Sequence, residues 1–61
     1  MIKECIQKLS SGENLSFGLA SSVMEDIMSG DATGAQIGAF VTALSVKGET
    51  PDEIAGMAEV M

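Results

Sequence analysis

Apolar residues recur at intervals of three and four along four stretches of this chain, and short polar corners separate the stretches. Such spacing places apolar side chains on one face of an α-helix. It predicts helices over residues 2–10, 17–29 and 34–47, and a fourth helix that begins at Pro51 and continues to Met61. The predicted fold class is all-α, a small orthogonal bundle of four short helices.

Each corner has a glycine, an acidic residue and then a hydroxyl residue in that order, at residues 12–16, 30–33 and 48–50. Glycine readily adopts the left-handed conformation that ends many helices. Serine or threonine caps the start of a helix by accepting a hydrogen bond from a backbone amide. We therefore expect each corner to end one helix and to start the next.

The third and fourth helices also have the residues of a capping box, in which a Gln or Glu three residues after the cap bonds back to the cap amide. These pairs are Thr33 with Gln36 and Thr50 with Glu53, and Pro51 supplies a preformed first helical residue. The fourth helix has no glycine, proline or basic residue to end it. We therefore expect it to be truncated at the last residue of the chain.

The helix over residues 34–47 is apolar or small on almost every side and has no charge before Lys47. Helices of this kind lie at the centre of a protein or in an interface, because a solvent-facing side would show charged residues. Gly34 and Gly38 are four residues apart, a spacing that lets a second helix approach closely. The bulky residues of this helix are Ile37, Phe40, Val41 and Leu44.

Two further expectations concern glycines and the last helix. A glycine inside a helix costs about 1 kcal/mol relative to alanine. Gly38 and Gly56 are therefore expected to weaken the fold. The apolar residues at helical spacing in the fourth helix predict a buried face formed by Ile54, Met57, Ala58 and Met61.

Composition and charge exclude several function classes. The 61 residues allow one domain, and their net charge is −6, without any arginine or histidine. Nucleic-acid binding is disfavoured, because phosphate contacts need clustered lysine or arginine. No apolar run approaches the roughly 18 to 20 residues of a membrane span, and the first residues lack the features of a signal peptide. The expected location is the cytoplasm.

Residues that could carry chemistry are few. Cys5 is the only cysteine, so it cannot form an internal disulfide and is interpreted as a small apolar residue of the first helix. Glu13, Asp31 and Glu49 lie at the corners, where carboxylates stabilise helix N-termini. The sequence has neither a calcium-binding loop nor a phosphate-binding glycine motif. It predicts no catalytic, no cofactor-binding and no metal-ligating residue in this chain.

The segments 12–16, 23–30, 32–40 and 43–56 resemble the N-terminal helical domain of anthranilate phosphoribosyltransferases, a domain shared with pyrimidine nucleoside phosphorylases. The resemblance covers nearly the whole chain without gaps, and its most specific part is Lys-Gly-Glu-Thr-Pro at 47–51. It implies that the chain is the N-terminal helical domain of a larger enzyme, and that the catalytic α/β domain is absent from it. The implied reaction joins anthranilate to phosphoribosyl pyrophosphate in tryptophan biosynthesis, with magnesium as cofactor of the parent enzyme only.

The resemblance also implies a homodimer that forms through this helical domain. We expect the first and third helices to provide packing and dimer surface through Ile2, Ile6, Ile37 and Val41. Two alternatives stay open. One is the same domain from a pyrimidine nucleoside phosphorylase. The other is a free-standing acidic helical module that binds a partner helix or itself, which the five methionines and the uncharged third helix would suit.

Overall fold

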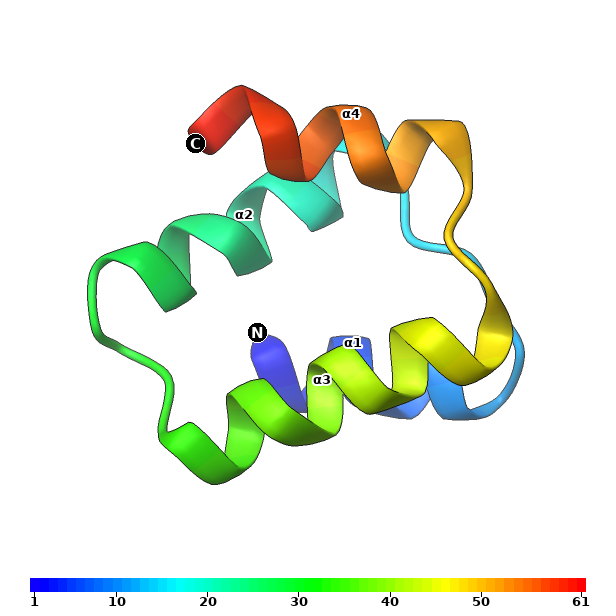
Figure 1. Cartoon of the computed structure of the whole chain (residues 1–61), viewed down its shortest axis with the longest axis horizontal. Coiled ribbons are helices and arrows are strands. Elements are labelled where there is room, and N and C mark those ends of the chain that lie inside the picture. Colours follow the sequence, from blue (N-terminus) through cyan, green and yellow to red (C-terminus); the bar gives the residue numbers. More distant parts are fainter.

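The computed structural model describes residues 1–61 and contains four helices and no strand (Figure 1). The predicted all-α bundle of four short helices is confirmed. The predicted helix starts agree with the structure, and the second and fourth helices each end one residue earlier than predicted. The helices are α1 (Ile2–Ser10), α2 (Phe17–Met28), α3 (Gly34–Lys47) and α4 (Pro51–Val60).

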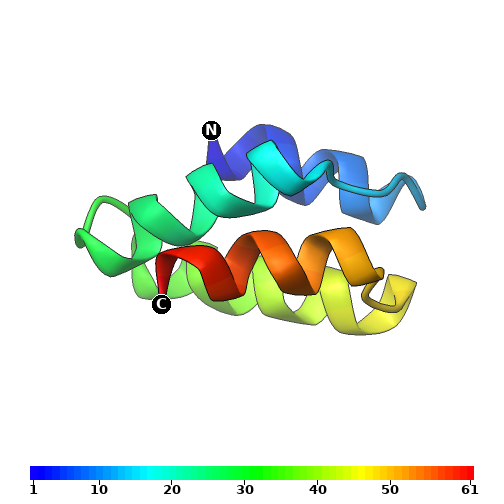
Figure 2. The ribbon, with the colours of Figure 1, turned by 90° about the horizontal axis from the view of Figure 1, so that it is seen from above.

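The helices pack as two pairs that interleave along the sequence. Helix α1 packs against α3, and α2 packs against α4, while α1 and α2 touch much less. In Figure 1 the α2/α4 pair lies above the α1/α3 pair, and Figure 2 shows α2 and α4 from above. Because each pair joins helices that are not consecutive, all three corners must bridge from one pair to the other.

The corners turn as predicted. Gly12, Gly30 and Gly48 have φ angles of +83°, +83° and +94°, which side-chain-bearing residues rarely adopt. The capping boxes are also confirmed, since Gln36 Oε1 and Glu53 Oε1 each accept a hydrogen bond of 2.9 Å from the amide of the cap residue. The three hydroxyl groups that cap α2, α3 and α4 are those of Ser16, Thr33 and Thr50.

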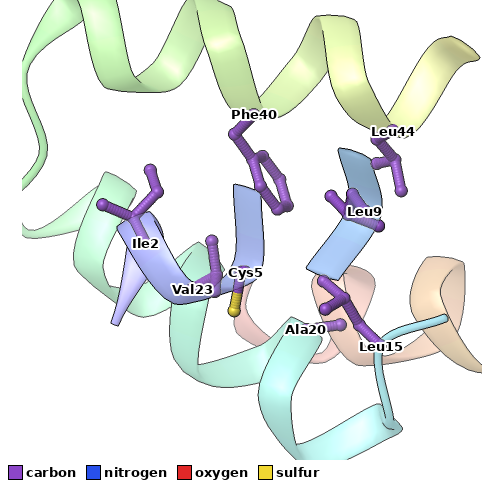
Figure 3. Packing of buried hydrophobic residues seen from close by; sticks show 8 residues of the cluster. All are labelled: Ile2, Cys5, Leu9, Leu15, Ala20, Val23, Phe40 and Leu44. Atoms are coloured by element: carbon purple, nitrogen blue, oxygen red, sulfur yellow. The ribbon is translucent and has the colours of Figure 1, made fainter. Parts of the chain in front are cut away.

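The core lies where the two pairs face one another (Figure 3). Cys5 is 1% exposed there, and burial raises the pKa of its thiol. Its predicted role as a small apolar core residue is therefore confirmed. Phe40 of α3 and Val23 of α2 are the largest apolar side chains that are fully enclosed. The complete core consists of Ile2, Cys5, Leu9, Leu15, Ala20, Val23, Phe40 and Leu44.

No other helix of this chain approaches Gly34 or Gly38 closely, so the expectation is not met within the chain. A Cβ atom built at either glycine would meet nothing within 4 Å. The close approach is instead at Gly56, where a Cβ atom would overlap the carbonyl oxygen of Phe17 and lie 3.0 Å from the Ala20 Cβ. Gly56 thus lets the backbones of α2 and α4 touch, which a residue with a Cβ atom could not do without a shift.

The buried face of α4 differs from the predicted one as well. Ile54 is 55% exposed and Met61 is 76% exposed, whereas Glu53 and Gly56 are buried. Met57 is the member of the predicted face that packs against the core. The reason is that Gly56 must face α2, and this rotates α4 so that Ile54 turns toward solvent.

Candidate interaction surface and its buried ion pair

The outer face of α3 is apolar and exposed. Val41 is 54% exposed and Val46 is 83% exposed, while α3 buries only Phe40 and Leu44. This helix was predicted to lie either at the centre of the fold or in an interface, and its exposed side excludes the centre of the fold. The remaining possibility is that the outer face of α3 contacts another surface.

A shallow groove of about 740 Å³ runs between α1 and α3, along the edge of this face that carries Val46. Val41 does not line the groove, because it lies about 140° from Val46 around the helix. Small residues of α3, Gly38, Ala39 and Thr42, form one side. Ile6 and Leu9 of α1 form part of the other side, and Val46 and Lys47 lie near the end of α3. An apolar groove lined by small residues is shaped to accept apolar side chains from another protein surface.

The four residues predicted to form packing and dimer surface have different exposures. Ile2 is 7% exposed and belongs to the core. Ile6 and Ile37 are half-buried, and Val41 is exposed. Ile2 and the partly buried Ile6 therefore provide packing, and a contact with another molecule would rest on Val41 and the groove.

A buried ion pair lies at the end of the groove, and sequence reasoning did not find it. Lys47 Nζ is 2.9 Å from Glu53 Oε1, and the two side chains are 7% and 0% exposed. Lys47 was interpreted only as a cation that suits the C-terminus of α3, and Glu53 only as a capping residue of α4. The capping box correctly directs Glu53 toward Thr50, but nothing local in the sequence shows that the carboxylate is enclosed.

Every polar atom of this pair has a partner. Glu53 Oε2 accepts a hydrogen bond of 2.6 Å from the Leu15 amide, in the corner between α1 and α2. Lys47 Nζ donates to Asn14 Oδ1 at 3.0 Å and to the Gly48 carbonyl oxygen at 2.7 Å, besides Glu53. Because no buried side-chain nitrogen or oxygen is left without a partner, the enclosed charges are compensated.

Acid should weaken the fold through Glu53. Burial by itself raises the pKa of this carboxyl, but hydrogen bonds from the Leu15 and Thr50 amides and from Lys47 outweigh burial and lower the pKa. A lowered pKa in the folded state adds stability above the unfolded-state pKa of about 4.3, and that stability is lost as the pH falls through the folded pKa. Urea unfolding of the natural chain should therefore need less denaturant as the pH falls below about 4.

A Glu53→Gln variant provides the comparison. It cannot titrate at this position, so its unfolding midpoint should change much less over the same acid range than that of the natural chain. Glu49→Gln, at an exposed acidic position of the same corner, should keep the acid sensitivity of the natural chain. Equal acid sensitivity in Glu53→Gln and the natural chain would mean that other carboxyl groups control acid unfolding.

The other acidic residues do not form a site. Glu13, Asp31 and Glu49 are exposed at the corners where they were predicted. Asp31 Oδ2 accepts a hydrogen bond of 3.1 Å from Ser29 Oγ. No three acidic, cysteine or histidine side chains lie close enough together to hold a metal ion. None of the four helices is both long enough and apolar enough to cross a membrane.

Known proteins resemble this chain throughout. Residues 3–61 match the family described as glycosyl transferase family, helical bundle domain. Anthranilate phosphoribosyltransferases of Dehalococcoides mccartyi and Methanocorpusculum labreanum are each 59% identical over 61 residues, which is 100% of this chain and 18% of each relative. The enzyme of that name from Chloroflexus aurantiacus is 60% identical over 60 residues, 98% of this chain and 18% of the relative. No solved structure matches. The chain thus spans 18% of the length of these relatives.

Proposed function

The chain belongs to the glycosyl transferase family as its helical bundle domain, and we propose that it serves as the N-terminal domain of an anthranilate phosphoribosyltransferase. The proposal rests on 59% identity over all 61 residues to enzymes of that name. The proposed reaction of the whole protein transfers a phosphoribosyl group from phosphoribosyl pyrophosphate to anthranilate. It belongs to tryptophan biosynthesis and takes place in the cytoplasm.

Within that enzyme we assign these residues a structural role. Their buried polar groups are engaged in the helix caps and in the Lys47–Glu53 pair. Substrates and magnesium are proposed to bind to the part of the enzyme outside this chain. The chain itself supplies a packed scaffold and an apolar surface.

The function is tested by reading the gene beyond the codon for Met61 and assaying the protein that it encodes. We expect an open frame with a glycine-rich loop and acidic metal ligands. The expressed protein should consume anthranilate, followed by its fluorescence, only when phosphoribosyl pyrophosphate and magnesium are both present. Phosphorolysis of pyrimidine nucleosides without anthranilate turnover would instead indicate the related phosphorylase, and a stop codon at that point would indicate a free-standing interaction module.

We further propose that the outer face of α3 and the adjacent groove form a homodimer contact. Three observations support this role: the exposed Val41 and Val46, the small residues that line the groove, and the lack of charge before Lys47. Interfaces are depleted of charge at their centre and rich in apolar contacts. A symmetric dimer would place the same apolar face of each copy against the other.

Val41→Asp should separate the dimer without unfolding the domain. Val41 is 54% exposed, so the folded monomer should lose no more than about 0.5 kcal/mol. A carboxylate enclosed in an apolar contact without a partner should raise the dimer dissociation constant by at least about tenfold. Sedimentation velocity over a concentration series measures the dissociation constant, and circular dichroism confirms the fold.

Ile54→Asp is the matched control for Val41→Asp. Ile54 is 55% exposed, nearly the same as Val41, but it lies on α4 in the other helix pair. This control should leave the dimer intact. A dimer that persists in Val41→Asp at low micromolar concentration would place the contact elsewhere on the protein.

A further inference from the structure

We propose that Lys47, Glu53 and Asn14 form a latch through which the state of the α1/α3 groove controls how firmly α4 is held. The latch consists of three contacts: Lys47 Nζ with Glu53 Oε1, Lys47 Nζ with Asn14 Oδ1, and the Leu15 amide with Glu53 Oε2. The link between the latch and dimerisation rests on the proposed function, in which a second copy of the chain occupies the groove. The coupling itself is a property of the folded domain.

The position of the latch supports this proposal. Lys47 ends α3, Glu53 lies in the first turn of α4, and Asn14 and Leu15 belong to the corner that leads into α2. The latch therefore joins the α1/α3 pair to the α2/α4 pair by polar contacts of 2.6 to 3.0 Å. These contacts add to the apolar core at one end of the molecule.

Lys47 belongs both to the groove and to the latch. It lines the groove, and its ammonium group also donates to Glu53 and to Asn14. Its side chain is 7% exposed and that of Glu53 is 0% exposed, so the remaining contact of the pair with solvent is through Lys47. A partner that covers the groove excludes this solvent, and an ion pair in a less polar environment attracts more strongly.

The consequence for α4 follows from the contacts of Glu53. This carboxylate fixes the Thr50 cap amide at the start of α4 and the Leu15 amide at the entry to α2. A stronger hold by Lys47 therefore lowers the frequency with which the first turn of α4 opens. Linkage makes the effect reciprocal, so a firmly seated α4 favours an occupied groove to the same extent.

The test fills the groove from within the chain, which removes any dependence on a dimer. All variants carry Val41→Asp and are made in the protein as its gene encodes it. Thr42→Trp places a large side chain in the groove, and Ser45→Trp places the same side chain on an exposed part of α3 that does not line the groove. Hydrogen exchange measured by mass spectrometry then reports on residues 11–16 and on α4.

The latch predicts that Thr42→Trp slows exchange in both segments by about fivefold or more, whereas Ser45→Trp does not. Adding Glu53→Gln should abolish the effect of Thr42→Trp. Adding Asn14→Ala, which removes one latch contact of Lys47 but keeps the ion pair, should reduce the effect in a protein whose circular dichroism spectrum stays helical. Unchanged exchange in Thr42→Trp would overturn the latch, as would a slowing that survives Glu53→Gln. The homodimer proposal is decided separately, by the dissociation constant of Val41→Asp.

Discussion

Lys47→Met should destabilise the domain by about 3 to 5 kcal/mol, because it leaves the enclosed Glu53 carboxylate without its only cationic partner. Domains of this size are only marginally stable. The variant should therefore be largely unfolded at 25 °C and pH 7. Far-ultraviolet circular dichroism of ligand-free protein at one fixed concentration measures the folded fraction of the variant, and urea unfolding of the natural chain gives the reference free energy.

The pH dependence identifies the cause of this loss. In Lys47→Met the carboxyl of Glu53 no longer has Lys47 to lower its pKa, so protonation removes much of the penalty. The natural chain and the variant should converge in stability near pH 3. A cost that stays the same at pH 3 and pH 7 would indicate lost packing of the lysine stem as the cause.

Two further variants complete the comparison. Lys3→Met removes an exposed lysine from α1 and should change the free energy of unfolding by less than about 0.5 kcal/mol. The double variant Lys47→Met with Glu53→Gln should recover part of the stability lost in Lys47→Met. The reason is that an enclosed neutral amide costs less than an enclosed unpaired charge.

Alanine substitution should have opposite effects at Gly56 and Gly38. At Gly56 the new methyl group would overlap the Phe17 carbonyl oxygen and press on Ala20, so α2 and α4 would have to separate. Such overpacking costs about 1 to 3 kcal/mol, even after the gain in helix propensity. At Gly38 the methyl group meets no atom within 4 Å, and the propensity gain of about 0.5 to 1 kcal/mol should remain.

Urea unfolding of the two alanine variants in dilute solution checks this prediction. The same substitution inside two helices then gives shifts of opposite sign in the unfolding midpoint. If Gly56→Ala proved as stabilising as Gly38→Ala, the two helices would have room to spare at their crossing. The close contact at Gly56 would then not determine the rotation of α4.

Local rules predicted the parts of this fold that depend on neighbours in sequence. Caps, capping boxes and left-handed glycines act over three or four residues, so the corners at 12–16, 30–33 and 48–50 were predicted correctly. The same is true of the helix starts and, to within one residue, of the helix ends, which follow from the caps and the apolar spacing.

What the sequence did not reveal depends on contacts between distant residues. The Glu53 carboxylate accepts a hydrogen bond from the Leu15 amide, 38 positions away in the chain. The spacing of apolar residues does not predict a contact between residues so far apart. Gly56 and Gly38 both lie inside helices, and only the path of α2 shows which one is in contact. For the candidate surface, the lack of charge on α3 was visible in sequence, but the depth and lining of the groove required the packing of α1.

The interleaved pairing of helices has a consequence for how this chain folds. The first half of the chain contains α1 and α2, which touch little, and the second half contains α3 and α4, which are not packed as a pair either. Neither half holds a hairpin that could form a stable intermediate by itself. The chain must close loops of intermediate length before any pair is buried, so its folding is slower than that of a simple helical hairpin and close to all-or-none. On the ribosome, the α2/α4 pair can form only after α4 has emerged.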